Sequence, residues 1–213
     1  MKNNITEVVF ILDASGSMYE LTDDTIGGFN SMLAEQRRKD SKVLISTVTF
    51  NDSSRVVHDR VDIREVKDLT RRDYVAGGCT ALIDAMGDAI HHISTVHRYI
   101  RPEDVPDNTL FIITTDGMEN ASHRYTSAQV KRMVEQKKEQ GWEFIFMGAN
   151  IDAVETAKCY GISADMAADY VSDGRGTRAN FKAARKAMMM AASGCRISAE
   201  WKEDIEEDMK RRK

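Results

Sequence analysis

Oxygen-bearing side chains follow a short apolar run near the start of the chain. In the stretch FILDASGSM, Asp13, Ser15 and Ser17 place a carboxylate and two hydroxyls at every second position. A second apolar run, TLFIITT, also ends in an aspartate, Asp116, and Thr80 follows two glycines and opens an amphipathic segment. Carboxylates and hydroxyls are ligands for hard cations such as Mg²⁺ or Mn²⁺. These five residues are therefore candidate metal ligands, provided that the fold brings them together.

The same residues allow other roles. A serine before a helix usually caps that helix, and either serine could do only this. Asp13 could instead be the nucleophile of a Mg²⁺-dependent phosphohydrolase. That chemistry favours a second acidic residue two positions on and a lysine that holds phosphate. Ser15 occupies the first place, and no lysine accompanies Thr80 or Asp116. A third hypothesis is a scaffold in which the metal is only structural.

Apolar runs and helical spacings alternate along the chain. The expected strands are Glu7–Leu12, Lys42–Phe50, Arg55–Val61, Thr109–Thr115, Trp142–Met147 and a weak one near 167–172. Expected helices run from Ile26 to Arg37-Arg38-Lys39, from Thr80, from Thr126, from Asp152, and from about Thr177 to Ser193. This order predicts an α/β fold: a doubly wound, mostly parallel six-stranded sheet with one antiparallel edge strand and helices on both faces, Rossmann-like.

Such a sheet explains how distant residues could form one site. Ligands of open α/β sheets bind at the carboxyl ends of strands, near the point where the strand order reverses. Asp13 and Asp116 each end a predicted strand, so neighbouring strands would bring them together. The length of 213 residues fits one domain, which we place at residues 1–194. Residues 195–213 form a charged helical tail whose narrow stripe of Trp201, Ile205 and Met209 predicts docking onto the domain. The segment Asp173-Gly-Arg-Gly predicts a turn before the last domain helix.

Composition narrows the function classes. The net charge is −4, with both signs spread along the chain, so we expect no nucleic-acid partner. Three cysteines without CxxC spacing favour a reducing compartment over a disulfide framework. The first apolar run is about five residues, too short for a secretory signal or a membrane span. We therefore expect a cytoplasmic protein that does not enter a membrane.

Three separate motifs carry a resemblance to a known family. DASGSM, GGCTAL and TTDGMEN resemble, in order, the Asp-x-Ser-x-Ser, threonine and second aspartate loops of the von Willebrand factor A (VWA) domain. The resemblance covers roughly residues 7–193 and implies the VWA fold with a complete metal-ion-dependent adhesion site. It implies that Ser15, Ser17 and Thr80 supply hydroxyls, while Asp13 and Asp116 bind the ion directly or through water.

The resemblance also implies a function. Members of the family mostly bind proteins through the metal and are not enzymes, and this chain resembles the bacterial-type, intracellular, single-domain members. We therefore expect a metal-dependent protein-binding module with Mg²⁺ as the ion, and Mn²⁺ or Ca²⁺ as alternatives. The partner would be a protein that offers an Asp or Glu side chain to the metal. Tyr19, Met118 and Glu119 directly follow metal loops and are predicted to form the partner-binding rim.

Overall fold

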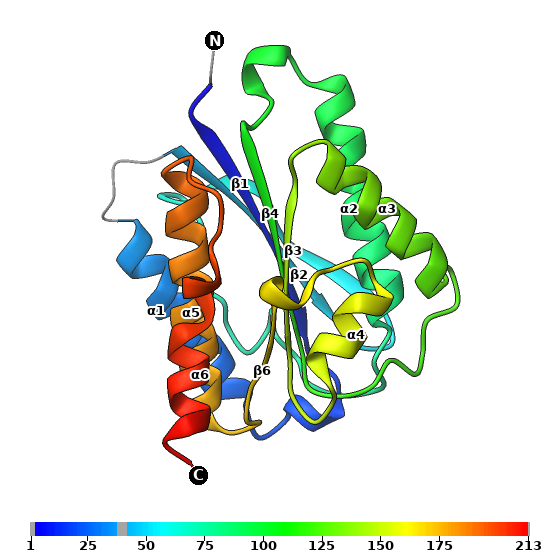
Figure 1. The fold of residues 1–213 in the computed structure, drawn as a ribbon, viewed down its shortest axis with the longest axis vertical. Helices are drawn as coiled ribbons and strands as arrows, with labels where there is room; N and C mark the ends of the chain where they lie inside the picture. The colour runs from blue at the N-terminus through cyan, green and yellow to red at the C-terminus, as the bar shows by residue number, and fades with distance from the viewer. Residues whose placement is uncertain (1–2, 38–41, 213) are drawn as a thin grey trace.

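A six-stranded sheet with helices on both faces forms the molecule (Figure 1). The computed structural model describes residues 3–37 and 42–212, and Arg38 and Lys39, expected to end the first helix, lie outside them. The strands are β1 (Ile5–Asp13), β2 (Lys42–Phe50), β3 (Ser54–Asp62), β4 (Asn108–Thr115), β5 (Glu143–Gly148) and β6 (Ala167–Asp169). The α-helices in this part of the chain are α1 (Thr22–Gln36), α2 (Leu82–Tyr99), α3 (Ser127–Glu139), α4 (Ala153–Cys159), α5 (Gly174–Ala192) and α6 (Glu203–Lys210).

The strand order is β3-β2-β1-β4-β5-β6. Every neighbouring pair is parallel except β2 and β3, which form the predicted antiparallel hairpin with β3 at the edge. From β1 the chain adds strands first on one side and then on the other, so the order reverses between β1 and β4. The predicted fold class is confirmed, and its reversal point lies between the two strands that end in aspartates.

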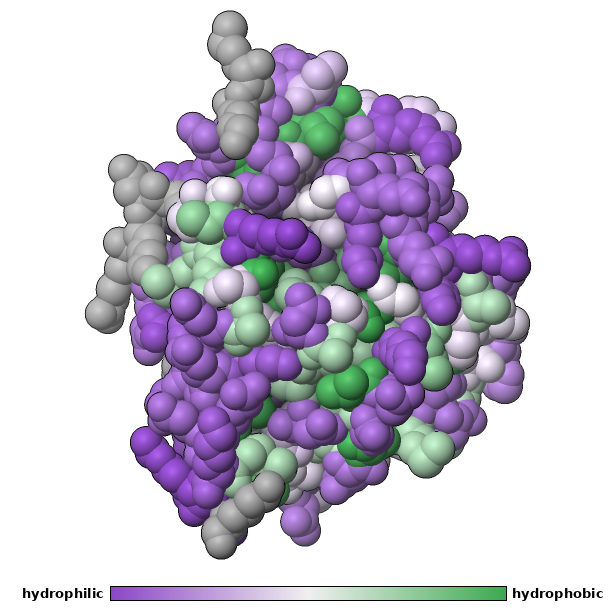
Figure 2. All heavy atoms as spheres, in the orientation of Figure 1, coloured by the Kyte–Doolittle hydropathy of each residue, from purple (hydrophilic) through white to green (hydrophobic). Residues whose placement is uncertain are grey.

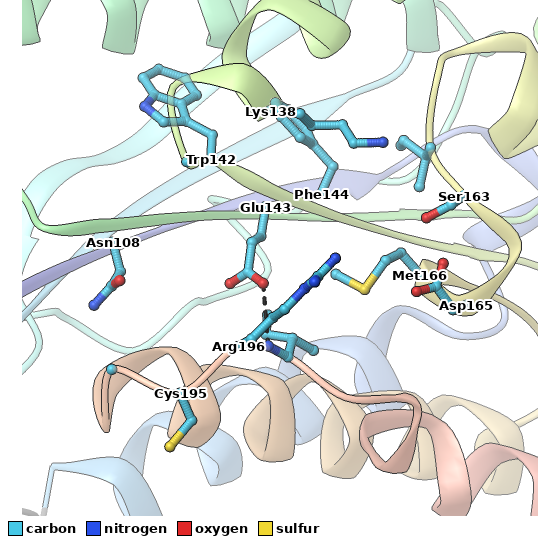
Figure 3. A pocket seen from close by; sticks show the side chains of 14 residues that line it. Asn108, Lys138, Trp142, Glu143, Phe144, Ser163, Asp165, Met166, Cys195 and Arg196 are labelled. Atoms are coloured by element: carbon cyan, nitrogen blue, oxygen red, sulfur yellow. Dashed lines mark hydrogen bonds between the residues drawn. The ribbon is translucent and has the colours of Figure 1, made fainter.

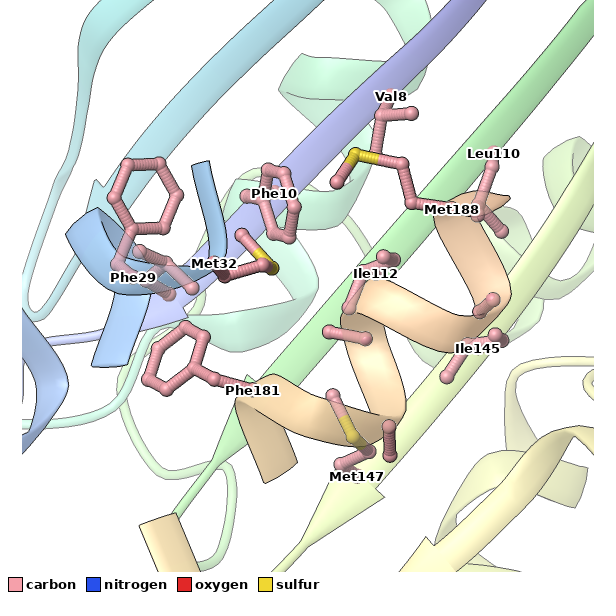
Figure 4. Close-up of a cluster of buried hydrophobic side chains, with 14 of the residues drawn as sticks. Val8, Phe10, Phe29, Met32, Leu110, Ile112, Ile145, Met147, Phe181 and Met188 are labelled. Atoms are coloured by element: carbon pink, nitrogen blue, oxygen red, sulfur yellow. The ribbon is translucent and has the colours of Figure 1, made fainter. Parts of the chain in front are cut away.

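Two apolar layers hold the helices against the sheet. Helices α1, α5 and α6 cover one face, and α2, α3 and α4 cover the other (Figure 1). In the first layer Phe10 and Ile112 of the sheet pack in one buried cluster with Phe29 of α1 and Met188 of α5 (Figure 4). Neighbouring strand residues face the opposite layer, as Val9 does. The strands are continuous apolar runs because both of their faces are covered.

The surface is predominantly hydrophilic on the face shown in Figure 2, where apolar side chains form separate patches. Among the described residues, no helix is long and apolar enough to cross a membrane.

The C-terminal segment packs against the domain through a buried tryptophan. A 3₁₀ turn, Ala199–Lys202, leads into α6. Trp201 lies in this turn, and it is fully buried. The Trp201 indole Nε1 donates a hydrogen bond of 2.9 Å to the carbonyl of Asp165, and Ile205 is also buried. The apolar stripe read from the sequence is thus the contact face of this segment.

The segment Asp173-Gly-Arg-Gly differs from its predicted role. Gly174 already begins α5, and Asp173 is its N-cap, with Oδ1 accepting the N–H of Gly176 at 2.7 Å. An aspartate before a helix satisfies one of the unpaired N–H groups of the first turn, which explains why the helix starts here. The same carboxylate accepts two hydrogen bonds from the Arg212 guanidinium, at 2.6 and 2.9 Å.

This ion pair predicts a stability that depends on pH. The Arg212 hydrogen bonds lower the pKa of Asp173 to about 2, against about 3.9 in an unfolded chain. A depressed folded-state pKa contributes stability that is complete above about pH 4 and is lost as the pH falls toward 2. We expect Asp173→Asn to flatten the pH dependence of the unfolding free energy in that window. Urea denaturation of both proteins at several pH values measures it, and equal slopes would contradict the prediction.

Candidate metal centre

Parallel strands β1 and β4 carry two aspartates to the same edge of the sheet. Leu12 pairs with Thr114, so Asp13 and Asp116 come next to each other where the strands end. Both residues are at most 3% exposed. The backbone N–H of Asp116 donates to Oδ2 of Asp13 at 3.1 Å. The two carboxylates therefore meet at the reversal point of the sheet, as the sequence predicted.

The two serines complete the first loop of this cluster. The N–H of Ser15 donates to Oδ1 of Asp13 at 2.7 Å, and the hydroxyls of Ser15 and Ser17 lie 3.2 Å apart. The Ser17 hydroxyl donates to the carbonyl of Asp116 at 2.8 Å. Ser15 is the N-cap residue of the 3₁₀ turn Gly16–Met18, but its hydroxyl makes no capping hydrogen bond there, and the N-cap residue of α1 is Leu21. The capping role left open by the sequence is therefore not the role of these hydroxyls.

Backbone hydrogen bonds join the threonine loop to the same cluster. The N–H of Gly16 donates to the carbonyl of Gly78 at 3.0 Å, and the N–H of Gly77 donates to the carbonyl of Ala14 at 2.9 Å. Gly78 has φ +75°, a left-handed conformation that favours glycine. Two residues later, Thr80 is 5% exposed, and its hydroxyl has no hydrogen-bond partner within residues 3–37 and 42–212. A hydroxyl without a protein partner is available to an external ligand.

The loop after β4 is hydrogen-bonded to the threonine loop. The Thr80 N–H donates to Oδ1 of Asn120 at 2.9 Å, and the Asn120 N–H donates to the Thr80 carbonyl at 3.1 Å. Glu119, predicted for the rim, uses its carboxylate to bind backbone N–H groups of neighbouring loops. Its Oε2 accepts the N–H of Ile83, in the first turn of α2, at 2.9 Å. Its Oε1 accepts the N–H of Ser122 at 2.8 Å. The other two expected rim residues, Tyr19 and Met118, are each 74% exposed.

Three loop residues that sequence reasoning missed contact the two aspartates. The buried hydroxyl of Tyr74 donates to the carbonyl of Asp13. The side-chain amide of Asn150 donates to Oδ1 of Asp116, and the Ser172 hydroxyl donates to Oδ2 at 2.7 Å. No local pattern marks them, because they lie on loops whose proximity depends on strand order.

The electrostatics of the cluster favour a cation. Burial raises the pKa of Asp116, and the negative charge of Asp13 raises it further, while the Ser172 and Asn150 hydrogen bonds act in the opposite direction. In the part of the chain that the structure describes, all hydrogen-bond partners of the two carboxylates are neutral groups. Two adjacent buried carboxylates without a positive partner are costly, and a divalent ion would neutralise them.

The donor set also selects the kind of ion. No three His, Cys, Asp or Glu side chains of the described residues come together in a way that could hold a metal. The cluster instead offers two carboxylates and the hydroxyls of Ser15, Ser17 and Thr80, which suits a hard divalent cation that keeps some water. The residues present therefore fit Mg²⁺ or Mn²⁺.

A cavity lies at the opposite end of the strands and is lined by different residues. It has a volume of about 430 Å³ and lies at the amino ends of β4 and β5, beside the segment after α5 (Figure 3). Glu143 points into it and accepts the N–H of Ile197 at 3.2 Å, and burial raises the pKa of this carboxyl group. This cavity is separate from the candidate metal centre.

The fold and site together define a class: a doubly wound α/β domain with an oxygen-rich side-chain cluster at the carboxyl edge of its sheet. The family model of the von Willebrand factor type A domain matches residues 7–191. The chain therefore belongs to the von Willebrand factor type A family, as the three motifs predicted. No curated protein matches it in sequence.

Solved structures share the fold at low sequence identity. A von Willebrand factor type A protein from Catenulispora acidiphila is 20% identical, with a TM-score of 0.56, covering 86% of this chain and 42% of that one. Proximal thread matrix protein 1 from the mussel byssus, with a zinc-occupied MIDAS motif, is 14% identical, with a TM-score of 0.52, covering 88% and 44%. Manganese-loaded TRAP protein of Plasmodium vivax is 16% identical, with a TM-score of 0.57, covering 85% and 74%. The chain thus spans less than half the length of the first two.

Proposed function

We propose that this protein is a metal-dependent protein-binding module. A divalent cation, Mg²⁺ or Mn²⁺, is held by Asp13, Ser15, Ser17, Thr80 and Asp116. The observation that carries the proposal is a buried pair of carboxylates whose loops are hydrogen-bonded to each other and to the threonine loop, with neutral partners alone around the carboxylates among the described residues. The zinc-occupied MIDAS motif of the mussel protein and the manganese-loaded TRAP protein support a divalent ion in a domain of this fold. A bound ion supplies a coordination position for a carboxylate oxygen of an acidic residue on the partner.

A binding role fits the geometry better than hydrolysis. Both oxygens of the Asp13 carboxylate accept hydrogen bonds, Oδ1 from the N–H of Ser15 and Oδ2 from the Thr115 hydroxyl at 2.7 Å and the N–H of Asp116. Oδ1 accepts only one of these bonds and keeps a lone pair for an ion. Residue 15, two positions after Asp13, is a serine rather than a second acid. Turnover of a generic phosphate ester that disappears in Asp13→Asn would favour the phosphohydrolase instead.

Metal-dependent capture tests the proposal. Immobilised protein should retain partner proteins in Mg²⁺, release them on chelation, and fail to retain them as Asp116→Ala. The retained proteins should then bind less well after their exposed acidic residues are replaced. If chelation leaves the captured proteins unchanged but lowers the melting temperature of this protein, the metal has a purely structural role.

We further propose a cytoplasmic location, which fluorescence microscopy of the tagged full-length protein in its own cells would test.

The exposed apolar side chains beside the centre predict a rim contribution to partner binding. Tyr19 and Met118 are each 74% exposed and follow the two aspartate loops. Large exposed side chains of this kind often carry binding energy. We expect Tyr19→Ala and Met118→Ala each to weaken capture by about 5- to 30-fold, or about 1–2 kcal/mol, without changing metal affinity. Tyr99→Ala is the control, because Tyr99 is 78% exposed at the end of α2. An equal loss of partner capture in all three variants would contradict a specific role of Tyr19 and Met118 in partner binding.

A further inference from the structure

Both oxygens of the Asp116 carboxylate are held by side chains outside the three metal motifs. The Asn150 amide donates to Oδ1, and the Ser172 hydroxyl donates to Oδ2 at 2.7 Å. Asp116 is 3% exposed, whereas Asn150 is exposed and Ser172 is half-buried, so the two donors reach the buried carboxylate from the surface side. A buried carboxylate held at both ends has a fixed orientation.

Sheet topology explains where these two donors come from. β4, β5 and β6 are parallel neighbours, with Thr115 opposite Gly148 and Gly148 opposite Asp169. Their carboxyl ends therefore lie in series along the edge that carries Asp116. Asn150 lies two residues beyond β5, and Ser172 lies three residues beyond β6. The metal centre thus extends over four adjacent strand ends, β1, β4, β5 and β6.

The backbone of Asn150 provides a second, independent observation. Asn150 has φ +57°, the left-handed region that residues other than glycine rarely adopt. Among the described residues, the other non-glycine residues with a positive φ are Asn4 and Arg60. Residues in such conformations persist where surrounding contacts hold them and are common at functional sites. At Asn150 this conformation accompanies the hydrogen bond from its side chain to Asp116.

We propose that Asn150 and Ser172 are positioning residues of the metal centre, an inference that rests on the function proposed above. Each oxygen of a carboxylate has about two lone pairs, so one hydrogen bond leaves the other available to the ion. The two donors fix the orientation of the Asp116 carboxylate and stabilise its negative charge in the metal-free protein. Groups that orient metal ligands in this way typically change metal affinity by about 10- to 100-fold when they are removed.

The test compares metal affinity in variants that delete each donor. Asn150→Gly removes the amide, and glycine accepts the left-handed backbone. Ser172→Ala removes the hydroxyl, while Ser172→Thr keeps one. Mn²⁺ affinity is measured by calorimetry, and the electron paramagnetic resonance spectrum of bound Mn²⁺ reports its ligand geometry. We expect about 10-fold weaker Mn²⁺ binding for each deletion and up to about 100-fold for both. Ser172→Thr should restore most of the affinity.

Matched controls separate positioning from general destabilisation. Asn4→Gly makes the same change at another left-handed asparagine, φ +51°, before the opposite end of β1. Ser193→Ala removes an exposed hydroxyl that donates to the carbonyl of Met190 at 2.8 Å. Both should bind Mn²⁺ like the wild type.

The outcomes distinguish this inference from the proposed function. Unchanged or tighter Mn²⁺ binding in both single variants overturns the positioning role and leaves the metal centre standing. Absence of Mn²⁺ binding in the wild type overturns both. The single variants keep the test valid if the double variant does not fold.

Discussion

Replacing Asp13 with asparagine will abolish binding of Mg²⁺ and Mn²⁺. The substitution keeps the size of the side chain but removes one of the two negative charges that face the ion. Affinity for hard cations depends strongly on the charge of their oxygen ligands. We expect at least a 100-fold loss of affinity, larger than the effect of removing groups that only orient a ligand. Titration calorimetry with each metal measures it, and far-ultraviolet circular dichroism establishes that the variant is folded.

Thr80 provides a companion variant with little structural risk. Asp13→Asn places an amide N–H₂ among the donors Ser15, Thr115 and Asp116, so part of its effect could arise from misfolding. The Thr80 hydroxyl has no hydrogen-bond partner within the described residues. Thr80→Val is nearly isosteric and deletes only that hydroxyl, whereas Thr80→Ser retains it.

We expect Thr80→Val to weaken metal binding by about 10-fold or more and Thr80→Ser to bind nearly as the wild type does. Normal affinity in a folded Thr80→Val protein would remove Thr80 from the ligand set. Normal affinity in Asp13→Asn would place the metal elsewhere in the molecule. Taken together, the two substitutions test the charge and the hydroxyl chemistry of the site separately.

The sequence predicted the parts of the centre that lie at the ends of buried strands. Asp13 and Asp116 each follow a continuous apolar run, and parallel strands carry their carboxyl ends to the same edge. The glycines before Thr80 mark a tight loop, and Gly78 does adopt φ +75°. These features are local or follow from topology, so the motif order and the alternation of strands and helices were sufficient to place them.

The remaining contacts depend on three-dimensional packing. Asn150 and Ser172 reach Asp116 because β5 and β6 are added in series beside β4. β6 itself has only three residues, too few for its pattern to fix register. Glu119 lies in the expected loop, but its carboxylate accepts backbone N–H groups in the first turn of α2 and in its own loop. Spacing in the sequence does not determine which way such a side chain turns.

Trp201→Ala will destabilise the whole domain, although Trp201 lies beyond the residues that match the family model. Its side chain is fully buried, in the same apolar cluster as Phe10, and its indole N–H is bonded to Asp165. Truncating a buried tryptophan typically costs about 3–5 kcal/mol. Met209→Ala is the matched control, because Met209 lies on α6 but is only partly buried, and it should cost about 1 kcal/mol or less.

Urea denaturation followed by circular dichroism measures both losses. A loss of about 3 kcal/mol or more in one cooperative transition would make residues 195–213 part of the folding unit, because a separately docked tail would melt first and leave the domain transition unchanged. A loss below about 1 kcal/mol for Trp201→Ala would instead support the boundary at residue 194 that the sequence predicted. Burial of Trp201 in the cluster that also contains α1 and α5 residues favours the first result, since the cavity left by the ring would open inside the main core.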